Sequence, residues 1–185
     1  MFMIEPMIGK MLLPLVGGAP AVWNTCVVFF QAMLLVGYLY AHYGPRWLGP
    51  RRHAALHIAL LALPVAWLPV GLGERVLASL PHTSNPAPWL LACLLVTVGL
   101  PFFVVSASAP LLQRWFAHNS ARNPYALYAA SNAGSLLGLL SYPLLWERTL
   151  SLQQQSRLWA FGYGGAAVLM AVCASFLLDE RLSFT

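Results

Sequence analysis

Residues 125–146 form an uncharged stretch of 22 residues, and this stretch constrains the fold more than any other part of the sequence. As a helix it is long enough to cross the hydrocarbon core of a bilayer, which is about 30 Å thick. Small side chains recur along one face, where Gly134 and Gly138 have the spacing that lets two helices approach closely in lipid. We therefore expect this helix to lie at the centre, with the other apolar segments packed around it.

The predicted contact face of this helix consists of small residues and one amide. The small residues, which we predict to be helix-packing residues, are Ala130, Ser131, Gly134, Ser135 and Gly138. Asn132 lies on the same face, and an amide without a partner in hydrocarbon costs on the order of several kcal/mol. We therefore expect Asn132 to form a hydrogen bond with another helix, either at residues 106–108 or at Gln31.

The composition of the chain is that of a membrane protein. The sequence contains 59% hydrophobic and 8% charged residues, whereas soluble domains contain about 25% charged residues. The predicted fold class is an all-α membrane helix bundle, a single membrane domain over residues 1–185 without a soluble domain. We predict about five transmembrane helices, at residues 21–40, 54–71, 89–112, 125–146 and 158–178.

Prolines and tryptophans add detail to these predicted spans. Pro64 and Pro69 are expected to kink the second span, and Pro101 and Pro110 interrupt the third. All seven tryptophans lie near an end of a predicted span, in agreement with the preference of tryptophan for the headgroup level. Residues 153–155 are expected to form the first turn of the last helix, which follows Ser151.

The charges bear on the partners and on the orientation of the chain. The net charge of +5 is distributed over short linkers without a basic run, so nucleic-acid binding is excluded and the lipid bilayer is the expected partner. Six Lys and Arg residues lie on the side of the linkers 41–53 and 113–124, against four on the other side. Because positive residues favour the cytoplasmic side, we predict a cytoplasmic C-terminus.

Three polar residues near or within apolar segments are candidates for specific contacts. Gln31 lies midway along the first predicted span and is expected to need an interhelical hydrogen bond. Residues 1–16 are too short and too interrupted by proline and glycine to span. Within them, Glu5 and Lys10 either pair with each other or act as interfacial charges that reach the headgroups. A role in contacting a substrate is the alternative.

The sequence contains no catalytic motif and no complete metal site. His53 and His57 are four residues apart, which places both on one helix face as metal ligands would be. No carboxylate or cysteine is placed to complete a site, so headgroup contacts are the favoured interpretation and no metal or other cofactor is predicted. The three cysteines match no zinc or disulfide pattern. A nucleophile elbow and a phosphate-binding loop are both missing, so no catalytic residue is predicted.

Several blocks of sequence carry a resemblance to a known family. They are residues 5–42, the segment APLLQRWFA at 109–117, the segment NPYALYAASNAGSLLGLLSYP at 123–143 and the segment QQSRLWAFGY at 154–163. In this order they resemble the membrane domain of bacterial fused transporter-like/spermidine synthase-like proteins. The resemblance implies a bacterial inner-membrane protein whose fold is distantly like half of a major-facilitator transporter.

Two departures from the family pattern affect the expected function. The family's membrane domain usually has a further helix before the position of Glu5, so this chain is expected to be a detached or truncated module. The family's soluble aminopropyltransferase-like domain, with its glycine-rich nucleotide site and catalytic aspartates, has no counterpart in this sequence. Any polyamine chemistry would therefore need another polypeptide.

Three functions are consistent with these observations. The favoured one is a structural or partner-binding membrane module, whose partners are other membrane protein subunits. The alternatives are a transporter-like half that forms a homodimer around a pathway for a small, cationic solute, and a membrane subunit that supports an aminopropyltransferase. The partner that copurifies in mild detergent distinguishes the three.

Overall fold

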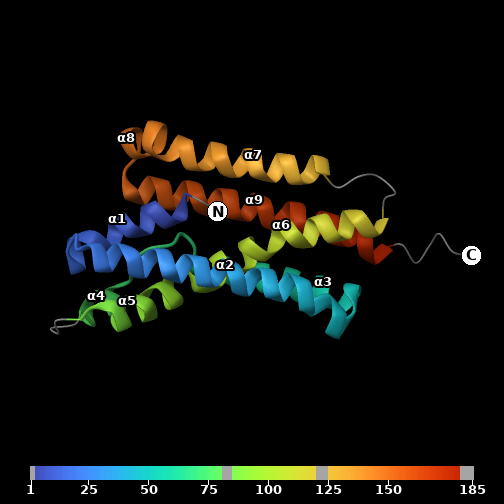
Figure 1. The fold of residues 1–185 in the computed structure, drawn as a ribbon, viewed down its shortest axis with the longest axis horizontal. Helices are drawn as coiled ribbons and strands as arrows, with labels where there is room; N and C mark the ends of the chain where they lie inside the picture. The colour runs from blue at the N-terminus through green and yellow to red at the C-terminus, as the bar shows by residue number, and fades with distance from the viewer. Residues whose placement is uncertain (1–2, 81–84, 120–124, 180–185) are drawn as a thin grey trace, which may run out of the picture.

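The structure, a computed structural model, describes residues 3–80, 85–119 and 125–179, and this part of the chain is helical without any strand. Four helices run along the long axis of the molecule (Figure 1): α2 (Pro20–Leu48), α6 (Leu100–Asn119), α7 (Tyr125–Ser141) and α9 (Leu152–Asp179). Two shorter helices of 13 residues each are α1 (Ile4–Val16) and α3 (Pro50–Ala62). The predicted all-α fold class is confirmed.

Short elements connect or extend these helices. A 3-10 turn, η1 (Leu63–Trp67), follows α3, and a five-residue helix, α4 (Glu74–Ala78), comes after it. The helix α5 (Ala87–Leu94) continues through the π-helical turn η2 (Leu95–Gly99) into α6. Similarly, α7 continues through the π-helical turn η3 (Tyr142–Trp146) into α8 (Glu147–Thr149).

Three helices of the described chain are long and apolar enough to cross a membrane: Pro20–Leu48, Ala87–Ala117 and Leu152–Phe176. They overlap the predicted spans at 21–40, 89–112 and 158–178. The predicted span at 54–71 is not one helix, because α3 ends at Ala62 and residues 68–73 are irregular. Residues 125–146 are helical but do not belong to these three. A count of five spans therefore remains a prediction.

The centre of the molecule is the continuous helix Ala87–Ala117, and the prediction of a central helix at residues 125–146 is wrong. In its most apolar window, 61% of the residues of Ala87–Ala117 are buried, against 28% for Pro20–Leu48 and 22% for Leu152–Phe176. None of the residues of α7 is buried. The large apolar side chains of α7 are exposed as well, since Leu136, Leu137, Leu139 and Leu140 are each at least 50% exposed.

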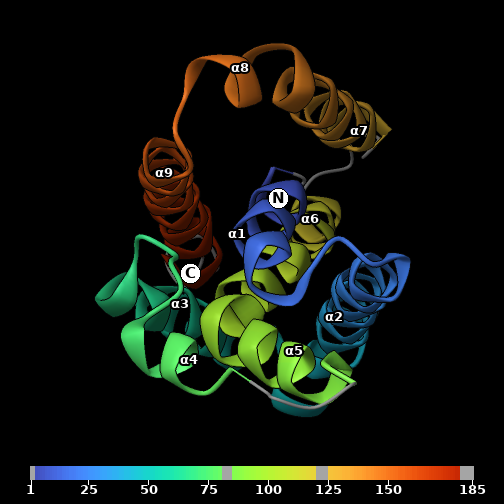
Figure 2. The same cartoon turned by 90° about the vertical axis from the view of Figure 1, so that its left-hand side faces the viewer.

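The helix α1 also belongs to the core, although it is too short to span. Its residues Ile4, Met7, Ile8 and Leu12 are at most 2% exposed. They recur every three or four residues and thus form one apolar face. Figure 2 shows α1 among the other helices, and α1 packs against α2 and α9. The helix α1 therefore packs into the bundle through this face.

Candidate functional site

The helix α7 lies apart from most of the bundle (Figure 2), and none of its residues is buried. A methyl group added to Gly134 or to Gly138 would meet no atom within 4 Å. Ser135 donates a hydrogen bond of 2.9 Å to the carbonyl of Ser131 within the same helix. The predicted packing residues, with Ala130, are therefore available for contact with another chain, which remains a prediction.

The expected hydrogen bond of Asn132 within this chain is not formed. Asn132 and Gln31 are both exposed, and neither bonds to another described residue. Ser106 and Ser108 instead donate to the carbonyls of Phe103 and Val104, at 2.7 and 2.8 Å. The amides of Asn132 and Gln31 are thus unpaired in the described part of this chain.

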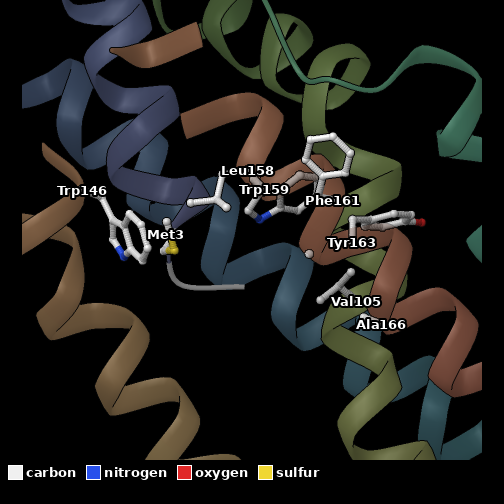
Figure 3. A pocket seen from close by; sticks show the side chains of 9 residues that line it. Met3, Val105, Trp146, Leu158, Trp159, Phe161, Tyr163 and Ala166 are labelled. Carbon is white, nitrogen blue, oxygen red and sulfur yellow. The ribbon is translucent and has the colours of Figure 1, made fainter. Parts of the chain in front are cut away.

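An apolar cavity of about 390 Å³ lies beside the junction of η3 with the bundle. Figure 3 shows Met3 and Trp146 at one edge of it and the side chains of α9, including Trp159, at the other. Val105 of α6 also lines it. The cavity therefore lies next to η3, the turn that follows α7, and between η3 and the helices α6 and α9.

Polar contacts fix the end of α7 that leads into α8. The Gln155 side-chain amide donates to the carbonyls of Trp146 and Leu150, at 3.3 and 2.9 Å. Lys10 of α1 forms an ion pair with Glu147 of α8. These contacts place α8 against α1 and α9, so the position of α7 is determined at this end.

Lys10 pairs with Glu147 and not with Glu5, although a Glu5–Lys10 pair was one of the two alternatives that the sequence left open. Glu5 is half-buried on α1 and forms no hydrogen bond or ion pair with any described residue. Burial raises the pKa of the Glu5 carboxyl group. The sequence offered no signal for Glu147 as the partner, because 137 positions separate it from Lys10.

Side chains of α9 donate hydrogen bonds to backbone carbonyls on both sides of the break after α3. The Tyr163 hydroxyl donates a hydrogen bond of 2.9 Å to the carbonyl of Leu61, and Ser156 donates to the carbonyl of Val70. Irregular backbone within a membrane needs such partners, because lipid supplies none. The segment around Val70 also lines two cavities of about 470 and 580 Å³.

His53 and His57 are fully buried between α2, α3 and α6, so the prediction of headgroup contacts is wrong in this chain. The Tyr40 ring lies 4.5 Å from the His53 ring and 5.8 Å from the His57 ring, between centroids. Burial, followed by the charge of Arg114, lowers the pKa of His53, and the nearby Tyr40 carbonyl opposes this effect. The described residues contain no group of three metal-ligating side chains.

Two glycines that sequence reasoning missed allow the closest approaches in the bundle. A methyl group at Gly37 of α2 would collide with the Ser106 side chain, and one at Gly44 would collide with the His53 ring. These two glycines are seven residues apart, so they lie on one face of α2 without forming the four-residue glycine spacing. A search for that spacing alone therefore selects α7.

Comparisons of the chain with protein-family models, with curated proteins and with solved structures found no match. The resemblance to the membrane domain of transporter-like/spermidine synthase-like fusions therefore remains a prediction from the sequence blocks.

Proposed function

We propose that this chain is an integral membrane module that binds another membrane protein through α7, in a structural or partner-binding role. The observation that carries the proposal is the isolation of α7, which has no buried residue and open space beside both Gly134 and Gly138. Small residues favour association of helices in lipid, because they allow close approach of the two backbones. The proposed partner element is a transmembrane helix that packs along this face.

The surroundings of α7 support this proposal. Its α8 end is fixed by the Lys10–Glu147 ion pair and by the hydrogen bonds of Gln155, so the face of the helix is presented in a defined position. The apolar cavity lined by Trp146 and Trp159 adjoins this end and offers an aromatic pocket to a side chain of the partner. A preorganised face of this kind reduces the entropy lost on association.

The test is purification of the full chain from its native membrane in mild detergent, together with two variants. Gly138→Leu places a large side chain on the proposed contact face. Gly165→Leu is the matched control, since Gly165 on α9 also has open space beside it. We expect a stoichiometric membrane protein partner with the parent and with Gly165→Leu, and its loss with Gly138→Leu. A parent chain that purifies as a monomer, or a partner that both variants retain equally, would contradict the proposal.

A transporter-like half that dimerises is the second candidate, supported by the broken helix after α3. Discontinuous helices often line the binding sites of transporters, and here the irregular segment at residues 68–73 lines two cavities. A homodimer that depends on Gly138 in the same purification would favour this candidate. A soluble transferase as the copurifying protein would instead favour the supporting role that the family resemblance implies.

A further inference from the structure

A groove of about 480 Å³ runs along the C-terminal half of α2, and no residue of the proposed partner face lines it. Its lining comes from α2, from His53 of α3 and from Phe103 of α6. Nearly all of its wall is apolar, because the Tyr40 hydroxyl and the His53 ring nitrogens are buried away from it. Hydrogen bonding therefore does not select what fills this groove, whereas a hydrocarbon chain matches its wall.

The groove opens towards the surroundings of the bundle. Val36, Leu39 and Trp47 line it and are 47%, 46% and 79% exposed. All three belong to Pro20–Leu48, one of the helices that are long and apolar enough to cross a membrane. From Val36 to Arg46 this helix rises about 15 Å, which is half of a hydrocarbon core about 30 Å thick. The groove thus has the length of an acyl chain in one leaflet.

One end of the groove carries positive charge. Arg46 follows Leu39 by seven residues and Tyr43 by three, so it continues the same face of α2 beyond the apolar wall. Its guanidinium carbon lies 5.7 Å from the centre of the Tyr43 ring, and that ring stacks on Trp47. Tyrosine and tryptophan favour the headgroup level of a membrane. With α2 across a bilayer, Arg46 therefore lies at the level of the lipid phosphates.

Two further arginines lie in the first turn of α3, directly after the end of α2. Arg51 and Arg52 are exposed, like Arg46, and none of the three forms an ion pair with a described residue. Figure 1 shows this junction of α2 and α3 at one end of the molecule. The helices α4 and α8, which carry Glu74 and Glu147, lie at the other end. No described side chain thus neutralises the arginines beside the groove.

We propose that the groove and the adjoining arginines bind an anionic phospholipid, of which phosphatidylglycerol is the simplest example. One acyl chain lies along α2 in the apolar groove, and the phosphate pairs with guanidinium groups at its end. Basic clusters beside membrane helices favour anionic headgroups. Phosphatidylcholine offers the same chains, but its own positive group cancels the charge of its phosphate. The charge of the headgroup therefore decides which lipid the site retains.

The binding test uses the full chain in mild detergent with a phosphatidylglycerol that carries a photoactivatable diazirine in one acyl chain. Mass spectrometry of the digested chain identifies the crosslinked residues. We expect the crosslinks to concentrate between Val36 and Leu48. Excess unlabelled phosphatidylglycerol should remove them, whereas the same excess of phosphatidylcholine with identical chains, or of inorganic phosphate, should not. This competition needs no variant to fold.

Two variants that each remove one exposed arginine separate this site from a general attraction of charge. Arg46→Gln removes a charge beside the groove, and Arg157→Gln removes one from α9, outside the groove lining. We expect binding of phosphatidylglycerol about fivefold weaker in Arg46→Gln, since a basic residue near an anionic surface contributes about 1 kcal/mol. Arg157→Gln should bind like the parent.

Four results would overturn the proposal. Crosslinks spread evenly over α2, α7 and α9, or equal displacement by phosphatidylcholine, would mean that the apolar wall takes any lipid. Equal losses of affinity in Arg46→Gln and Arg157→Gln would indicate only a general attraction to the positive chain. Displacement by inorganic phosphate would indicate a site for a free anion instead of a lipid.

Discussion

The hydroxyl of Tyr163 donates a hydrogen bond of 2.9 Å to the backbone carbonyl of Leu61, next to the end of α3. Pro64 follows three residues later and has no N–H group to continue the helical bonds, so carbonyls at this point lose their normal partners. After the break, the Ser156 hydroxyl donates a hydrogen bond to the Val70 carbonyl. The helix α9 thus supplies hydrogen-bond donors to backbone carbonyls on both sides of the interruption.

Removal of this donor should destabilise the bundle. In Tyr163→Phe the buried Leu61 carbonyl loses its partner, and we expect a loss of about 1–2 kcal/mol in the free energy of unfolding. Thermal unfolding in detergent measures the effect. Tyr128→Phe on α7 is the control, because Tyr128 is 56% exposed, and it should unfold like the parent. Equal unfolding temperatures of the two variants would mean that the Leu61 carbonyl finds another hydrogen-bond donor.

Leucine substitutions should distinguish a glycine that packs against another helix from a glycine with open space beside it. Gly44→Leu forces α2 away from the His53 ring, and overpacking of this kind costs about 1–3 kcal/mol. Gly134→Leu has open space around it and should leave the unfolding temperature unchanged. Thermal unfolding of both variants in detergent is the measurement. A lower stability of Gly134→Leu than of Gly44→Leu would mean that α7, and not α2, makes the closest helix contacts.

Some of the fold follows from local chemistry and was therefore predictable. The helical class and three of the predicted spans follow from long apolar stretches, and the break near Pro64 follows from the missing N–H group. The start of α9 also depends on neighbouring residues. The Ser151 N–H donates to the Gln154 side-chain oxygen at 2.9 Å, and the Ser151 hydroxyl accepts a hydrogen bond from the Gln154 N–H. Each of these features depends on residues close together in the sequence.

The arrangement of the helices depends on contacts between distant residues, and here the predictions failed. The glycine spacing of α7 predicts a central contact, whereas Gly37 and Gly44 of α2 make the close approaches, against Ser106 and His53. The fit of a glycine depends on the side chain opposite, which the sequence of one helix does not contain. The same reason explains why the pairing of Lys10 with Glu147 was missed.

The ion pair between Lys10 and Glu147 should respond to charge exchange. Both side chains are 39% exposed, so the pair contributes no more than about 1 kcal/mol and weakens in salt. Lys10→Glu should lower the unfolding temperature, because it places two carboxylates together. The double variant Lys10→Glu with Glu147→Lys should restore most of the loss. If the double variant unfolds as early as the single one, the two residues do not interact directly.

Asn132 provides the last test, since it separates a contact with a partner from a role in folding. Asn132 is exposed and forms no hydrogen bond with another described residue, so Asn132→Leu should not lower the unfolding temperature of the isolated chain. Polar contacts between membrane helices contribute about 0.6 kcal/mol on average and up to about 1.7 kcal/mol. If a partner helix covers α7, the same substitution should weaken association by about three- to twentyfold.

The measurement is the affinity for the copurified partner in detergent, with Gln31→Leu as the control. Gln31 is also an exposed amide in a helix long enough to span, but it lies on α2 rather than on α7. We expect Gln31→Leu to bind the partner like the parent. If Asn132→Leu also binds like the parent while Gly138→Leu loses the partner, the interface includes the glycines of α7 but not the Asn132 side chain. If Asn132→Leu unfolds early, Asn132 has a partner within the folded chain, and the isolated position of α7 is wrong.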